Sequence, residues 1–255
     1  MGFDPEWLAL REPADHAARD ATLLRQAADI AGPSPLILDL ACGTGSNLRA
    51  FSQHIAEDAL WRLVDNDRGL LDVAKAQASD TVEIFEIDIS DPEDLPLNEV
   101  TLVAASALLD LVAASWLRAM VATLRARDLP FYAALSYDGR MNWTPDLEED
   151  ARVTNAFNTH QRTDKGFGPA LGPDAVPLAK ELFIEHGFSV NVAQSDWKFA
   201  PGADALKDVL MRDVTQAAEE AGYCATDAWR QRSASRALSI GHLDLLALPP
   251  GCRSN

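Results

Sequence analysis

The stretch Leu36-Ile37-Leu38-Asp39-Leu40-Ala41-Cys42-Gly43-Thr44-Gly45 reads as a buried strand that runs straight into a glycine turn. Aliphatic side chains fill the strand, and Gly43 and Gly45 lack the Cβ atoms that would block a close approach to the backbone. Ser46 then begins a stretch with apolar residues on one helical face, namely Leu48, Phe51 and Ile55. Because a ligand at such a turn meets free amides and the positive end of a helix, the motif predicts a pocket for a nucleotide-like molecule.

A second apolar run, Leu60-Trp61-Arg62-Leu63-Val64, ends in Asp65. An acid at the end of the second strand, about twenty residues past the glycine turn, can accept hydrogen bonds from a ribose. The dinucleotide fingerprint GxGxxG needs a third glycine for close packing of helix on strand, and Leu48 occupies that position. The pattern therefore predicts a nucleoside pocket and argues against NAD or FAD.

The run from Asp39 to Gly45 resembles motif I of the class I S-adenosylmethionine-dependent methyltransferases, in the DxACGTG form common among their small-molecule enzymes. The resemblance extends to the second strand, to the third strand at 84–89 with its terminal Asp88, and to the fourth strand and following segment at 100–111. It continues through 179–188 and 241–249, which match the helix before the sixth strand and the seventh strand. Roughly residues 33 to 250 are covered.

This resemblance implies S-adenosylmethionine as the cofactor and S-adenosylhomocysteine as the product. In the family, the acid after the second strand binds the ribose, the acid after the third strand reads the adenine amino group, and the segment after the fourth strand lies near the methyl group. Taken alone, each of these residues could equally cap a helix or form a turn. Their order and spacing along the chain together indicate a cofactor site. The cofactor-binding residues implied here are Asp39, Ala41, Gly43, Gly45, Asp65, Asn66, Asp88, Ile89 and Ser106.

The amino-acid composition indicates which kinds of partner the protein can bind. The 255 residues include 47% apolar and 24% charged residues, and the formal net charge of -17 opposes attraction to nucleic acid or anionic membranes. A small-molecule substrate and a monomer or homodimer are expected. Cys42, Cys224 and Cys252 lack metal-binding spacing, and no signal peptide is visible at residues 1–5, so free thiols and a cytoplasmic location are expected.

Strand-like and helix-like blocks alternate from residue 36 onward, which predicts an α/β fold with a mostly parallel sheet. The resemblance implies a Rossmann-like, doubly wound sheet of seven strands in the order 3-2-1-4-5-7-6, with the last strand antiparallel. Strands are predicted near 36–41, 60–66, 82–88, 100–105, 130–136, 188–197 and 239–248, and helices at 69–79, 114–127, 175–186, 203–221 and 226–237. Residues 1–32 are expected to form a helical cap segment, 33–255 the cofactor-binding domain, and 137–174 an insert that binds the substrate.

The segment 136–143 follows the fifth strand and is predicted to be a recognition loop at the carboxyl edge of the sheet. It leads into an insert where His160, Arg162 and Lys165 reverse the local charge of an acidic chain. These cations suit a carboxylate or phosphate on the acceptor, with a solvated polar loop as the alternative. The predicted substrate-binding residues are Arg140, Trp143, Asn158, Arg162 and Lys165.

A sulfonium methyl group is already activated, so the protein mainly has to align the acceptor and exclude water. Where the acceptor must lose a proton, His160 is the first candidate base, followed by Asp110 and Tyr137. The alternative for Asp110 is a helix N-terminal residue. No His, Asp and Glu cluster has the spacing of a metal site. Arg11, Asp15 and Arg19 fall four residues apart, and we interpret them as a surface ion-pair ladder.

Three other functions can be compared with the sequence pattern. A catalytically inactive cofactor-binding scaffold would keep the fold without the chemistry, although the intact motif residues argue against it. An NAD-binding oxidoreductase conflicts with Leu48. Nucleic-acid methylation would require a D/N-P-P-aromatic loop after the fourth strand or a Pro-Cys nucleophile, and the sequence has Ala-Ser-Ala-Leu-Leu-Asp at 105–110 instead.

Overall fold

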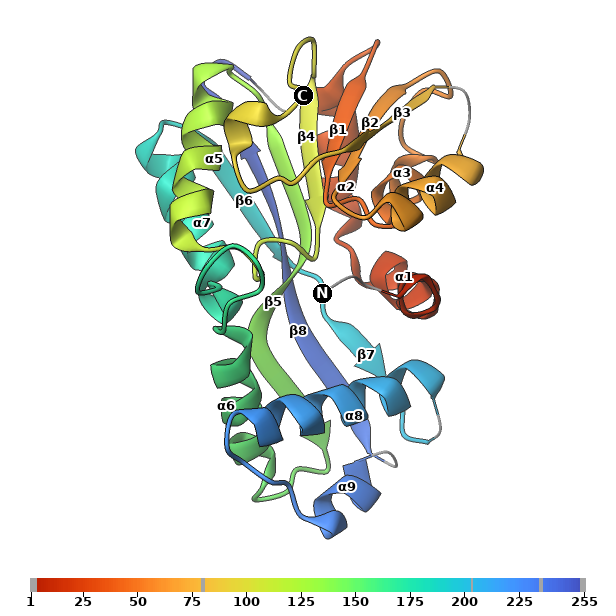
Figure 1. Ribbon diagram of the computed structural model, residues 1–255, viewed down its shortest axis with the longest axis vertical. Coiled ribbons are helices and arrows are strands. Elements are labelled where there is room, and N and C mark those ends of the chain that lie inside the picture. The colour runs from red at the N-terminus through yellow and green to blue at the C-terminus, as the bar shows by residue number, and fades with distance from the viewer. Residues whose placement is uncertain (1–3, 79–80, 203, 234–235, 253–255) are drawn as a thin grey trace.

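A mixed β-sheet organises the chain, and the computed structural model describes it over residues 4–78, 81–202, 204–233 and 236–252 (Figure 1). The main path of the sheet has the order β3-β2-β1-β4-β5-β8-β6, with β8 antiparallel to both of its neighbours and the other pairs parallel. The predicted strand order and fold class are therefore confirmed. The strands are β1 (Leu36–Leu40), β2 (Leu60–Asp65), β3 (Val82–Glu86), β4 (Leu102–Ser106), β5 (Phe131–Thr144), β6 (Ser189–Gln194), β7 (Trp197–Phe199) and β8 (Ala237–Leu248); the short β7, which pairs with β8, was not predicted as a separate strand.

Helices cover both faces of this sheet (Figure 1). Strand side chains alternate between the faces, so Leu38 and Leu40 join one apolar cluster while Ile37 joins another. The first cluster is completed by α5 (Ala114–Ala126) and α7 (Ala175–Glu185), and the second by α2 (Ala21–Ala31), α3 (Ser46–Phe51) and α4 (Arg68–Ala76). Burial on both faces explains why the central strands read as continuous aliphatic runs.

Local sequence signals set the ends of several helices. The side chains of Asp20 and Asp67 accept backbone hydrogen bonds at the N-termini of α2 and α4. Gly32, at the end of α2, has a φ of 85°, which glycine adopts without strain. Within the described part of the chain, no helix is long and apolar enough to cross a membrane.

The two longest strands, β5 and β8, continue below the sheet into a lower lobe (Figure 1). The prediction of a loop over 137–143 is wrong, because these residues belong to β5. The sequence Asp138-Gly139-Arg140 resembles a turn, yet it forms an irregularity within the strand, where Gly139 has a φ of 89° and the pairing with β8 shifts register. Beyond it, Met141 and Trp143 are buried again.

The lower lobe has its own apolar cluster, enclosed by α6 (Asp150–Gln161), α8 (Ala205–Glu220) and α9 (Asp227–Ser233). Two buried ionic groups stabilise the lower lobe through hydrogen bonds. The carboxylate of Asp150 accepts hydrogen bonds from the Arg236 guanidinium and from the Trp229 indole, each at 2.7 Å. The ammonium of Lys207 donates to the carbonyls of Ala200, Gly202 and Arg236. Because every buried charge here meets opposite charge or dipoles, its desolvation is offset.

Asp244 of β8 joins the sheet to the amino-terminal helices. Its side chain is fully buried, and one carboxylate oxygen accepts from the Leu135 amide while the other accepts from the Asp20 amide, both at 2.8 Å. Leu135 has a φ of 57° and lies at a register shift between β5 and β8. The Asp244 carboxylate therefore accepts from a backbone amide at a point where the regular pairing of the two strands is interrupted. Asp244 therefore stabilises both the bend of β5 and the start of α2.

Replacing Asp244 with alanine is expected to destabilise the protein, because the buried Leu135 amide loses its acceptor at about 1–3 kcal/mol and the part-buried Asp20 amide loses its acceptor as well. Urea denaturation followed by circular dichroism measures the change in the free energy of unfolding. The matched control is Asp72→Ala, which removes an exposed ion pair with Arg68 and should cost less than about 1 kcal/mol. Equal stability of the Asp244→Ala variant and the wild type would contradict this role.

Candidate active site

A cavity lies at the carboxyl ends of β1, β2 and β4, where the glycine turn meets α1 (Pro5–Ala18). This is the edge of the sheet at which parallel α/β folds bind ligands. Seven of the nine predicted cofactor residues line it: Asp39, Ala41, Gly43, Asp65, Asn66, Ile89 and Ser106. Gly45 and Asp88 do not line it.

The glycine turn places its two glycines in different surroundings. Gly43 has a φ of 55° and lines the cavity, where a Cβ atom would lie 3.2 Å from the Leu8 side chain of α1. Gly45 has a φ of 84° and precedes α3, and a Cβ atom there would lie 3.5 Å from Ala74 of α4. Gly43 thus lets α1 approach the turn, while Gly45 sets the path of the backbone into α3.

Asp65 at the end of β2 is fixed by two backbone hydrogen bonds. One carboxylate oxygen accepts from the Gly43 amide at 2.9 Å, and the other accepts from the Asp67 amide at 3.0 Å. The residue is 8% exposed and lines the cavity. The same carboxylate therefore holds the glycine turn in place and presents acceptor lone pairs to a ligand.

Asp39 at the end of β1 is almost fully buried. The Asn47 side-chain amide donates to its Oδ1 at 2.7 Å, whereas Asp39 Oδ2 and Asn47 Oδ1 have no hydrogen-bond partner in the described part of the chain. Burial raises the pKa of Asp39 to about 7, although the bond from Asn47 opposes this shift. Both residues line the cavity, so they offer it unpaired oxygen acceptors.

Asp88, the predicted adenine acceptor, is exposed at the end of β3. Its carboxylate accepts from the Ser90 amide at 2.9 Å and from the Ser90 hydroxyl, and these bonds lower its pKa. Its neighbours Ile87 and Ile89 line the cavity. The structure thus brings the apolar residues around Asp88 to the cavity, with its carboxylate engaged in a turn.

Helix α1 closes the opposite side of the cavity with Arg11 and Asp15. The Arg11 guanidinium donates twice to the Asp15 carboxylate and lies 5.0 Å from the centre of the Trp197 ring, whose indole also donates to Asp15. The interpretation of Arg11, Asp15 and Arg19 as a surface ladder is wrong, because Asp15 and Arg19 are only 5% and 6% exposed. The helix continues through Pro13 and packs against β7 and α8, which covers this face.

Two further contacts hold α1 on the sheet. Glu12 forms an ion pair with Arg49 of α3, and the Arg19 guanidinium donates to the Ser106 hydroxyl at 3.0 Å. Arg49 also donates to the carbonyl of Thr44 in the glycine turn. The amino-terminal helix is therefore tied to the turn and to the end of β4.

The segment after β4 supplies apolar lining and one buried acid. Leu108 and Leu111 line the cavity, and Asp110 lies between them in the chain with 8% exposure. Asp110 Oδ1 has no hydrogen-bond partner among the described residues. Burial raises the pKa of Asp110 to about 6, against the opposing charges of Arg11 and Lys165.

Most of the predicted substrate and base residues instead build the lower lobe. The Tyr137 hydroxyl donates to Asn158, whose side-chain amide donates to the Gly139 carbonyl, and burial raises the pKa of Tyr137. Trp143 packs edge-to-face on Trp229. Arg140, by contrast, is paired with carboxylates of Asp138 and Asp196.

The three cations of the insert do not act together. His160 pairs with Glu220 at 2.9 Å and Arg162 with Asp174 at 2.8 Å. Lys165 lines the cavity. Several residues that line the cavity were not predicted from the sequence: Leu8, Arg11, Asp15, Asn47, Asp67, Leu108, Leu111 and Phe167. The helical spacing of Arg11 and Asp15 would have indicated these two if Pro13 had been accepted inside a helix.

No cluster of three or more His, Cys, Asp or Glu side chains in the described ranges is arranged to hold a metal ion. The three cysteines are free thiols in the structure.

Comparison with known proteins agrees with this geometry. Residues 37–130, which hold the glycine turn and strands β1 to β4, match a family described as "Methyltransferase domain". No curated protein sequence matches the chain.

Solved structures with the same fold share little sequence with the chain. The YcgJ protein from Bacillus subtilis is 15% identical, with a TM-score of 0.58 over 92% of this chain and 98% of its own. A putative methyltransferase from Bacillus halodurans is 14% identical, with a TM-score of 0.52 over 89% and 96% of the two chains. A SAM-dependent methyltransferase from Thiobacillus denitrificans, in complex with S-adenosyl-L-homocysteine, is 17% identical, with a TM-score of 0.50 over 97% and 100%.

These structures establish the fold, and the family match identifies the domain. The predicted enzyme class, a methyltransferase, is confirmed with it. The chain carries a methyltransferase domain in residues 37–130, and its resemblance to the class I S-adenosylmethionine-dependent methyltransferases is confirmed.

Proposed function

We propose that the protein transfers the methyl group of S-adenosylmethionine to a small-molecule acceptor, one that bears a carboxylate or phosphate. The observation that carries the proposal is the cavity at the ends of β1, β2 and β4, in which Asp65 is bonded to the glycine turn. The structural neighbour from Thiobacillus denitrificans was crystallised with S-adenosyl-L-homocysteine, which supports the same ligand here.

The residues of the cavity fit this cofactor. Four acids line it, namely Asp15, Asp39, Asp65 and Asp67, against the two cations Arg11 and Lys165. S-adenosylmethionine carries a sulfonium and an ammonium group, and this excess of acids favours a cationic ligand. The unpaired oxygens of Asp39 and Asn47 are suitable acceptors for an ammonium group, and Asp65 can accept from a ribose.

The bound cofactor supplies a methyl group that is already activated for transfer. The protein then has to hold the acceptor atom in line at roughly 3–3.5 Å and exclude water. Leu108, Leu111 and Phe167 provide an apolar wall for this purpose. The Arg11–Asp15 pair, stacked on Trp197, encloses the site from α1.

Among the three candidate bases, the geometry favours Asp110. Asp110 does not itself line the cavity, but Leu108 and Leu111 on either side of it in the chain do, its carboxyl is buried, and its Oδ1 has no partner in the described residues. His160 is engaged with Glu220, and the Tyr137 hydroxyl donates to Asn158, so both of these groups already have partners. Asp110 can therefore accept a proton from a hydroxyl or amine acceptor, provided it is ionised.

The proposal includes a cytoplasmic protein, monomeric or homodimeric, that acts without nucleic acid or membrane. The net charge of -17 disfavours anionic surfaces, and the free thiols suit a reducing compartment. The alternatives are an inactive cofactor-binding scaffold and, less favoured because Leu48 replaces the third glycine, an NAD-binding oxidoreductase.

Calorimetric titration of the purified protein should show saturable binding of S-adenosylmethionine and S-adenosylhomocysteine and no binding of NAD. Asp65→Ala is expected to weaken both sulfur ligands roughly 10- to 100-fold, because a charge-assisted hydrogen bond to the ribose is lost. Asp72→Ala, which removes an exposed acid on α4, serves as the control and should bind normally. Unchanged affinity of Asp65→Ala would contradict the ribose role, and binding of NAD alone would refute the methyltransferase proposal.

For a hydroxyl or amine acceptor, Asp110→Asn is expected to lower kcat by about 100-fold or more, the usual contribution of a general base. The carboxyl accepts a proton only when ionised, and its pKa is about 6, so wild-type kcat should fall as the pH drops below about 6. Initial rates of S-adenosylhomocysteine release measure both effects. His160→Ala should keep its rate, whereas a large loss there with normal activity of Asp110→Asn would reverse the assignment.

A further inference from the structure

One wall of the cavity is a loop between α6 and the short helix η2 (Gly172–Asp174), and it is fastened to the segment after β4. Ala170 forms a β-bridge with Ala113, and the Leu171 amide donates to the Val112 carbonyl at 2.9 Å. The Gly172 amide donates to the carbonyl of Asp110 at 2.9 Å. The loop therefore has a fixed position beside the candidate base.

Within the loop, Asp164 sets the conformation. Its Oδ1 accepts from the amides of Gly166 and Gly168, at 2.7 and 3.0 Å, and both glycines have positive φ. Phe167 lies between these glycines and packs edge-to-face on Trp116 of α5. This tight turn holds Lys165 and Phe167 at the cavity.

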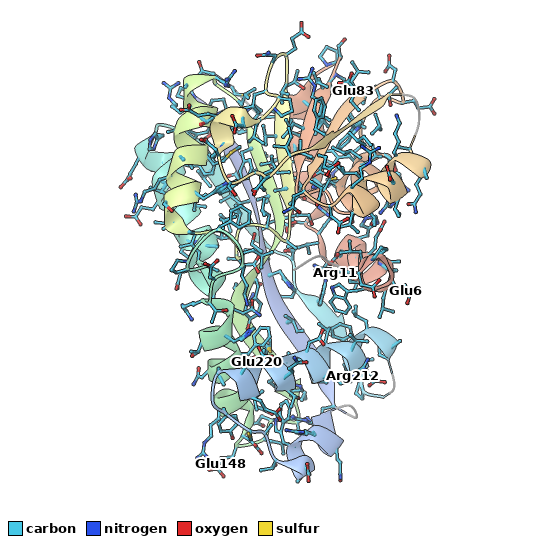
Figure 2. All side chains as sticks on the ribbon, in the orientation of Figure 1. Glu6, Arg11, Glu83, Glu148, Arg212 and Glu220 are labelled. Atoms are coloured by element: carbon cyan, nitrogen blue, oxygen red, sulfur yellow. The ribbon has the colours of Figure 1, made fainter. Side chains whose placement is uncertain are left out.

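The ammonium of Lys165 has neither a hydrogen bond nor an ion pair with any residue that the structure describes. Desolvation lowers its pKa, while the more distant charges of Glu220 and Asp110 oppose that shift. Glu220 lies on α8 and pairs with His160; Figure 2 labels Glu220 on the lower lobe and Arg11 above it, near α1. Lys165 is thus a half-buried cation that lines a ligand cavity without a partner.

Arg11, the other cation that lines the cavity, already forms an ion pair with Asp15. Its guanidinium donates twice to Asp15 and stacks on Trp197. An unpaired cation has more net charge to offer an incoming anion than a cation whose charge is already balanced by a carboxylate. This leaves Lys165 as the group best placed to receive it.

We propose that Lys165 is the specificity-determining residue of the acceptor site, and that it binds the carboxylate or phosphate of a small anionic acceptor. This inference rests on the proposed function. The loop that carries Lys165 is hydrogen-bonded to the Asp110 backbone through the Gly172 amide, so the anionic group of the acceptor is recognised on a segment joined to the candidate base. The methionine carboxylate of the cofactor is the other source of such an anion, and the test separates the two.

The test compares wild type, Lys165→Met and Lys165→Arg, with Lys180→Met on the solvent-exposed face of α7 as the matched control. Calorimetry first measures S-adenosylhomocysteine affinity. Initial rates of methyl transfer are then measured with a set of small hydroxy- and aminocarboxylates and phosphate monoesters, each beside its neutral ester or alcohol counterpart. Wild type should favour the anions, and Lys165→Met should raise the KM for the best anion roughly 10- to 100-fold with unchanged S-adenosylhomocysteine affinity. Lys165→Arg should recover much of the loss, and Lys180→Met should match wild type.

The other outcomes overturn the inference in distinguishable ways. Weaker S-adenosylhomocysteine binding in Lys165→Met would assign the lysine to the cofactor. Equal methylation of neutral and anionic compounds, or no methylation of any anion in the set, would remove the anionic acceptor while leaving the methyltransferase in place. Failure of wild type to bind either sulfur ligand would refute the proposed function together with the inference.

Discussion

The cavity depends on the hydrogen bonds between the Asp65 carboxylate and the backbone of the glycine turn. Asp65 stands at the end of β2, and by accepting from the Gly43 amide it fixes the turn that follows β1. A second bond, from the Asp67 amide, fixes the carboxylate itself. One side chain thus links the end of β2 to the turn that follows the adjacent strand β1, and both line the cavity. The same side chain remains available to a ligand, because each carboxylate oxygen has two lone pairs.

The amino-terminal helix α1 depends on this turn in its own way. Gly43 leaves room for Leu8, and the Arg11–Asp15 pair and Arg19 attach the helix to β7 and to the end of β4. Charged groups that are this buried would be costly without partners, and Asp15 has two donors, from Arg11 and Trp197. The helix therefore acts as a fixed wall that connects the sheet to the lower lobe.

Electrostatics divides the cavity into two regions. Asp39, Asp65 and Asp67 surround the strand ends, which suits a cationic cofactor. Lys165 lines the same cavity from the turn that Asp164 holds in place. In a chain with a net charge of -17, one unpaired cation at this position is informative, because acids are abundant elsewhere and could have neutralised it.

The sequence by itself determined the central strands, their order through a family resemblance, and most of the cofactor residues. These signals are local: a continuous aliphatic run marks a strand buried on both faces, and glycines followed by a helix mark a ligand turn. Only the tertiary structure decided how far β5 extends, because the segment around Gly139 looks like a turn until pairing with β8 shows it as an irregular strand. It also decided which cations are free. His160 and Arg162 find acids 60 and 12 residues away along the chain, while Lys165 finds none in the described residues, and such long-range pairing leaves no periodic trace in the sequence.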